Sequence, residues 1–324
     1  MNFYPANIED ELELRPPLPL EHGPDVPIQY KYVLHNHLCR MYLACDSLEL
    51  GTEGRYASLV LFHRYACHYF HNHNDFDVNV NVNVNVKELH KQLGKVASAC
   101  LFLGSKTTEQ ARRLRDIINV SYKLDFMCER QNMNVNHSND ELSNIDIYEA
   151  TYPPDLDDMY WDMKETLIVV EQSVLRLLHF DFIVSSPHKV LWLIVKTMND
   201  DGYSEKERCD TNTPTFMMNM NPFKKQNLYQ RECIMKQAWS ILNNTLFHTD
   251  ALRFDVIVLA SAALYISIKQ ITQEIFEKVK IDQKSNNYQQ MEEEKVENNQ
   301  NWWKLFGVSD TLFFKAVTCI ENQL

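Results

Sequence analysis

Apolar residues recur along most of the chain at the three- and four-residue spacing that is typical of amphipathic α-helices. One helical segment occurs twice: residues 96–106, VASACLFLGSK, return as LASAALYISIK at residues 259–269. Small residues occupy the middle of both copies, which allows neighbouring helices to approach closely, and a lysine closes each copy. A repeated apolar helix of this kind indicates a duplicated helical unit, in which the repeated helix is central.

The same spacing predicts the other helices. In the first unit they are expected near residues 31–48, 53–72, 87–105, 111–121 and 156–179. In the second unit they are expected from Pro187 onward, near 227–246 and 252–270, from Trp302, and from Ser309 to about residue 322. Ser186 is a favourable N-cap for a helix that begins at Pro187. We therefore expect an all-α fold of two tandem five-helix domains, residues 30–182 and 183–324.

Polar, low-complexity segments interrupt this pattern. The acidic, proline-rich residues 1–29 are predicted to form a disordered arm, since proline excludes a helix and little is left to bury. Insertions are expected near residues 75–86, 129–151, 200–226 and 280–299. The first of them alternates Val and Asn, a period that also suits a strand. The low complexity and the helical patterns on both sides favour a loop expansion instead.

Composition narrows the classes of function. Only 7 glycines occur in 324 residues, which argues against turn-rich β folds and against glycine-rich phosphate loops. Lys and Arg total 32 against 44 Asp and Glu, a net charge of −12, and the basic cluster at 112–115 is one helical turn long. A phosphate backbone would repel such a chain, so nucleic acid is an unlikely partner.

The cellular compartment can be predicted from targeting signals, apolar runs and cysteine spacing. We find no secretory signal and expect no membrane-spanning segment, because no apolar run reaches about 18–20 residues. The 8 cysteines include no C-x-x-C pair. We therefore expect an intracellular, soluble protein of the nucleus or the cytoplasm, or both.

No group of residues supports catalysis. His63, His68, His71 and His73 are dense, but their spacing does not place two metal ligands on one helical face. Cys100 lies in an apolar helix and is expected in the core rather than as a nucleophile. We therefore expect no enzyme activity, no metal and no cofactor.

Two charged residues interrupt apolar helices. Lys106 ends the first repeat helix and could simply interact with that helix's own C-terminal dipole. Glu171 is the lone acidic residue in the apolar run 167–178 and could simply face solvent. Spacing alone favours these two simple interpretations over a binding role. Lys269, in the second copy, is best explained by the dipole, with no comparable acidic partner expected.

The chain resembles the cyclins over about residues 30–323, and the tandem units resemble two cyclin boxes. The motifs that carry the resemblance are His63-Arg64-Tyr65, residues 100–106, residues 115–119, Glu171 and residues 174–182. More narrowly, residues 115–120, 186–189 and 302–306 resemble cyclin Q, a subfamily that activates cyclin-dependent kinase 10.

The resemblance implies a non-catalytic regulatory subunit that binds and activates a cyclin-dependent protein kinase as a heterodimer. It implies that Lys106 and Glu171 bind the kinase C-helix and its neighbouring backbone. An apolar seat for that helix is implied at Leu103, Leu175, Phe180 and Phe182. The alternative is a cyclin-fold transcription adaptor that binds nucleic acid or transcription proteins without a kinase, against which the net charge argues.

Overall fold

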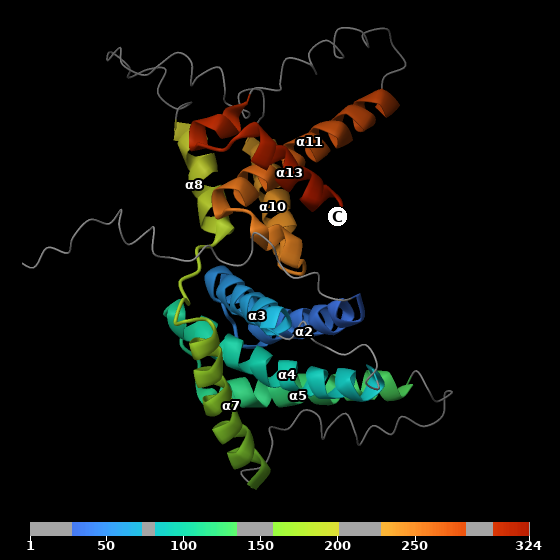
Figure 1. Cartoon of the computed structure of the whole chain (residues 1–324). Helices are drawn as coiled ribbons and strands as arrows, with labels where there is room; N and C mark the ends of the chain where they lie inside the picture. The colour runs from blue at the N-terminus through green and yellow to red at the C-terminus, as the bar shows by residue number, and fades with distance from the viewer. Residues whose placement is uncertain (1–27, 73–81, 135–157, 201–227, 283–300, 324) are drawn as a thin grey trace, which may run out of the picture. The chain divides into compact units, whose positions relative to one another are not determined.

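The structure is a computed structural model that describes residues 28–72, 82–134, 158–200, 228–282 and 301–323. Across these ranges the regular structure is helical, with no strand, which confirms the all-α prediction. The chain divides into two compact units, Met1–Val184 and Ser185–Leu324 (Figure 1). Each unit is described by itself.

The first unit contains five α-helices among its described residues. They are α2 (Ile28–Ser47), α3 (Thr52–Asn72), α4 (Val82–Thr107), α5 (Leu114–Asn134) and α7 (Asp158–Leu177). Helix α4 packs against each of the other four, as the small residues of the repeat predict for a central helix.

The centre of α4 shows why small residues are needed there. Ala99 is completely buried, and Gly104 lies against Ser58 of α3. A Cβ atom at Gly104 would lie 2.7 Å from the backbone nitrogen of Ser58, far closer than van der Waals contact. The missing side chain therefore sets how closely α3 approaches α4.

The second unit is built around the other copy of the repeat. Among its described residues, the α-helices are α8 (Pro187–Asp200), α10 (Leu228–Thr245), α11 (Val256–Asp282) and α13 (Asp310–Glu321), and the 3-10 segments are η2 (Thr249–Arg253) and η3 (Trp302–Phe306). Helix α11 packs against α8, α10 and α13. The predicted start of α8 is confirmed, since the backbone N–H of His188 donates to Ser186 Oγ at 3.3 Å.

Two predicted insertion boundaries are wrong. Helix α4 begins at Val82, so residues 82–86 of the Val-Asn repeat are helical, and α5 continues to Asn134, past the expected boundary at 129. Helix α11 ends at Asp282, close to the boundary expected near residue 280. Val and Asn cost only about 0.7 kcal/mol each in a helix, and adding a residue to an existing helix is far easier than starting one. The arm at 1–27 and the remainder of the four insertions lie outside the described residues.

Helix α11 bears on the prediction that the chain has no membrane-spanning segment. By length and composition, Val256–Glu274 would suit a membrane span, whereas no such segment was expected. However, 56 % of this window is buried inside the unit, including Leu259, Leu264 and Ile266. The central helix of a globular bundle passes the same test, so the match is weak evidence for a membrane.

Candidate functional site

Lys106 and Glu171 form an ion pair that joins the last turn of α4 to the middle of α7. The Lys106 ammonium also lies over the ring of Phe102, 4.0 Å from its centroid. The Lys106 side chain is 39 % exposed, whereas that of Glu171 is only 13 % exposed. Neither simple interpretation therefore holds: Glu171 does not face solvent, and Lys106 interacts with a second helix as well as with its own.

The residues of the expected apolar seat divide between core and surface. Leu103, one turn before Lys106, is only 4 % exposed and belongs to the core of the unit. Leu175, one turn after Glu171, is half-buried. Phe180 and Phe182 follow the end of α7 and are 62 % and 38 % exposed. The surface part of the seat therefore comes from α7 and from the segment after it.

The end of α7 has an unusual backbone. His179 and Phe180 have φ angles of 50° and 61°, in the left-handed region that non-glycine residues rarely enter. The Phe180 N–H donates to the Leu175 carbonyl at 2.8 Å, which closes the last turn of the helix. This closure turns the chain sharply, and the ring of Phe180 is left at the surface.

A half-buried arginine contacts the segment that follows. Arg64 of α3 donates from Nη1 to the backbone carbonyls of Asp181 and Ile183, at 3.1 Å and 3.4 Å. The same nitrogen lies 3.8 Å from the Asp181 carboxylate. Burial lowers the Arg64 pKa, and the nearby Asp181 opposes that shift. Arg64 belongs to the His63-Arg64-Tyr65 motif, but no role for it was predicted from the sequence.

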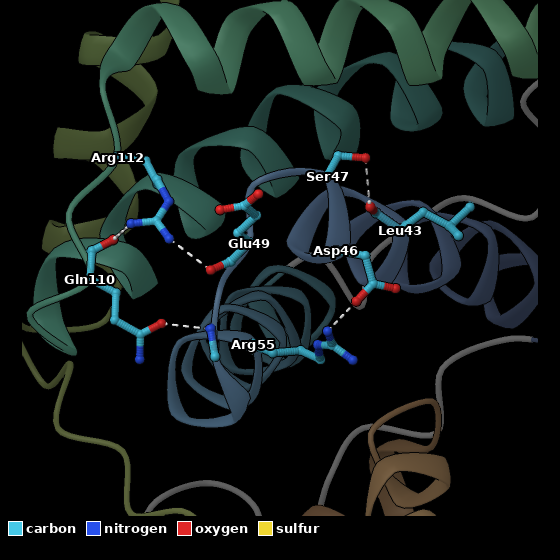
Figure 2. A network of polar contacts seen from close by, with 8 residues as sticks. Leu43, Asp46, Ser47, Glu49, Arg55, Gln110 and Arg112 are labelled. Carbon is cyan, nitrogen blue, oxygen red and sulfur yellow. Dashed lines mark hydrogen bonds and ion pairs between the residues drawn. The ribbon is translucent and has the colours of Figure 1, made fainter.

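The connection after Lys106 is held by a polar network (Figure 2). Arg112 donates to the carbonyls of Leu48, Glu49 and Gln110 at 2.6, 2.7 and 3.1 Å. The side-chain oxygen of Gln110 accepts from the Gly51 N–H at 2.7 Å. The network ties the α4–α5 connection to the α2–α3 turn, so one arginine of the basic cluster at 112–115 is engaged inside the unit.

Helix α7 carries an apolar stripe that is largely exposed, which its spacing did not predict. Trp161 and Ile168 are 53 % and 40 % exposed, and with Leu175 they recur at every seventh residue. Glu171 lies between Ile168 and Leu175 on the same helical face. The seven-residue recurrence is the signal that could have found this stripe, but single-sequence periodicity does not tell a buried stripe from an exposed one.

The second repeat contains an ion pair that was not expected. Lys269 Nζ lies 2.8 Å from the Glu321 carboxylate on α13, and this hydrogen bond raises the Lys269 pKa. Helix α11 continues well past Lys269, so the predicted interaction with the helix C-terminus is wrong, as is the expected lack of an acidic partner. Tyr265, the counterpart of Phe102, packs edge-on against Trp303 and Phe313 at centroid distances of 5.9 Å and 5.4 Å.

The structure describes only part of the dense histidine cluster, and it describes Cys100. His63 is 1 % exposed, and no group of three metal-ligating side chains occurs in the part of the chain that the structure describes. The side chain of His71 and all of His73 lie outside that part. Cys100 is fully buried, and burial raises the pKa of its thiol, which keeps it in the unreactive protonated form.

The known proteins with a similar sequence include several cyclins. No protein-family model matches this chain. Mouse Cyclin-L2 is 24 % identical over 215 residues, 66 % of this chain and 29 % of that protein. Cyclin-L1 of Xenopus laevis is 24 % identical over 176 residues, 54 % of this chain and 26 % of that protein. A solved structure of the CAK complex from Chaetomium thermophilum bound to ATP-gamma-S covers 92 % of this chain and 72 % of its own, with a TM-score of 0.43 and 10 % identity, too weak a likeness to argue from.

The similarity to these cyclins confirms the predicted resemblance to the cyclin family. These relatives are Cyclin-L1 and Cyclin-L2, so they do not support the more specific resemblance to cyclin Q. The match spans less than a third of the length of these relatives.

Proposed function

We propose that the chain is a non-catalytic cyclin that binds a cyclin-dependent kinase and activates it by holding the kinase C-helix in the active position. The observation that carries this proposal is the Lys106–Glu171 ion pair, together with the exposed aromatic side chains of Phe180 and Phe182. An apolar centre flanked by oriented charges is the usual composition of a specific protein interface.

The two charges have different roles in this proposal. An ammonium group has three donors, and Lys106 is exposed enough to donate to kinase backbone carbonyls while it stays paired with Glu171. Glu171 is largely covered, so it orients Lys106 and offers the kinase little surface of its own. Leu175, Phe180 and Phe182 supply the apolar contact, and Leu103 supports them from the core.

Activation then requires no chemistry on the cyclin. An isolated kinase of this class holds its C-helix glutamate away from the ATP-binding lysine, and docking the C-helix inward completes that ion pair. The cyclin binds only the inward arrangement well, so it shifts the kinase population toward that arrangement. In this proposal the chain acts in the nucleus, the cytoplasm or both.

The kinase is identified by co-purification. The assignment to cyclin-dependent kinase 10 rests on the resemblance to cyclin Q alone. Mass spectrometry of proteins recovered with the tagged full chain from its own cells decides which kinase binds. Recovery of transcription proteins without a kinase, or salt-sensitive DNA binding, would favour the adaptor alternative.

The site is tested with the kinase so identified, expressed and purified separately. Lys106→Glu and Glu171→Lys are expected to weaken its binding at least about tenfold while the helical circular dichroism is unchanged. Lys269→Glu and Glu321→Lys are matched controls, because they break the corresponding ion pair of the second unit. Unchanged affinity in the first-unit variants, or an equal loss in the controls, would reject the site.

A further inference from the structure

The segment after α7 has a conformation that its own residues do not favour. His179 and Phe180 are successive left-handed residues, and neither is glycine. Each such residue costs about 1–3 kcal/mol and persists only where the surroundings enforce it. Phe180 is 62 % exposed, so its own side chain contributes little packing, whereas the ring of His179 meets that of His68 of α3 edge-on, with 6.4 Å between the ring centroids.

Arg64 of α3 provides hydrogen bonds to this segment from outside it. Its side chain is 13 % exposed, and its Nη1 atom reaches the Asp181 and Ile183 carbonyls as well as the Asp181 carboxylate. Both ends of residues 181–183 are thus bound to one guanidinium on α3. Because Asp181 is drawn toward α3, its neighbours Phe180 and Phe182 are left at the surface.

We propose that Arg64 is a positioning residue for kinase binding, which holds residues 179–183 in the conformation that presents Phe180, Phe182 and Ile183. This inference rests on the proposed function and adds Ile183 to the apolar seat. Without Arg64 the segment would have to be ordered when the kinase binds. Ordering a segment on binding costs affinity even when every contact of the complex is kept.

Arg40 offers a matched control within the same unit. Its side chain is also 13 % exposed, and its Nη1 atom lies 2.9 Å from the Asp125 carboxylate, so Arg40 joins α2 to α5. Arg40→Ala therefore removes an equally covered arginine and its ion pair without touching the segment after α7. It measures what loss of such an arginine does to the unit in general.

The experiment compares Arg64→Ala, Arg64→Lys and Arg40→Ala in the full chain. Hydrogen exchange of the free chain measures the order of residues 179–184, and the purified kinase identified by co-purification measures the dissociation constant. Arg64→Ala is expected to speed exchange in this segment and to weaken kinase binding about tenfold. Arg64→Lys should give an intermediate loss, because a single ammonium cannot reproduce the planar fork of a guanidinium. Arg40→Ala should change neither quantity.

A rescue variant separates positioning from general stability. Glycine adopts the left-handed region freely, so adding His179→Gly to Arg64→Ala should recover part of the lost affinity. Faster exchange with unchanged affinity would overturn the positioning role while the proposed function stands on the Lys106 and Glu171 variants. Unchanged hydrogen exchange in Arg64→Ala would show that Arg64 does not order this segment. A wild-type chain that binds no kinase would reject the proposed function, and with it the role of Arg64 in kinase binding. Hydrogen exchange would still show whether Arg64 orders residues 179–183.

Discussion

The ammonium of Lys269 lies 2.8 Å from the Glu321 carboxylate, and it thereby repeats in the second unit the pair that Lys106 and Glu171 form in the first. In both units the lysine of the repeat joins the central helix to the last helix. The presence of an acidic partner therefore does not distinguish the two lysines. What differs is the surroundings of the two pairs. In the first unit, the helix that carries the glutamate, α7, is followed by the exposed residues Phe180 and Phe182.

A charge-swap variant tests whether Lys106 touches the kinase or only joins two helices. The double change Lys106→Glu with Glu171→Lys keeps an ion pair between α4 and α7 but places the negative charge at the more exposed position. We expect kinase binding to stay at least about tenfold weaker than wild type, since the ammonium donor is displaced. Recovery of wild-type affinity would mean that the pair only joins the helices.

The fold was largely predictable because helix periodicity is local. Apolar spacing located the helices, and small residues identified the central helix of each unit. The partner of Lys269 was not predictable, because Glu321 lies on a different helix and no local spacing encodes a contact between distant segments. The same holds for Arg64, whose contacts with residues 181–183 depend on how α3 packs beside the end of α7.

The two repeats should respond differently to small changes in their central helices. Gly104→Ala places a Cβ atom against the backbone of Ser58, which cannot move without shifting α3, so we expect a loss of about 1–3 kcal/mol. Ser267 stands at the position of Gly104 in the second repeat and donates to the Ile234 carbonyl at 2.6 Å. Ser267→Ala should cost about 1 kcal/mol. Urea unfolding measures both, and a neutral Gly104→Ala would contradict the close approach of α3 and α4.

Arg112 should stabilise the first unit through its three backbone acceptors, of which Figure 2 shows the carbonyls of Glu49 and Gln110. Arg112→Ala is expected to cost about 2–3 kcal/mol, because hydrogen bonds to a charged donor are lost at two connections at once. Arg112→Lys should recover little of this loss, since an ammonium cannot span the same carbonyls. Arg113→Ala, at the exposed neighbouring position, is the control and should be close to neutral in the same unfolding assay.

His37 should make the stability of the first unit depend on pH. Its side chain on α2 is 1 % exposed, and its ring lies 4.4 Å from that of His90 on α4. Burial, with repulsion from His90 and Arg40, lowers the His37 pKa from its ordinary value of 6.5 to about 3. Asp125 of α5 lines the same small cavity and is paired with Arg40, so it does not offset this repulsion fully.

The sign of the effect follows from the direction of this shift. Above pH 6.5, His37 is neutral in both the folded and the unfolded chain, so it has no effect on stability. Below pH 6.5 the unfolded chain takes up a proton that the folded chain refuses until about pH 3. The free energy of unfolding should therefore fall by up to about 1.4 kcal/mol per pH unit as the pH drops from 6.5 toward 5. Urea titrations across this range should show a flatter dependence for His37→Gln than for wild type. Equal slopes for wild type and His37→Gln would show that His37 accepts its proton in the folded chain at an ordinary pH.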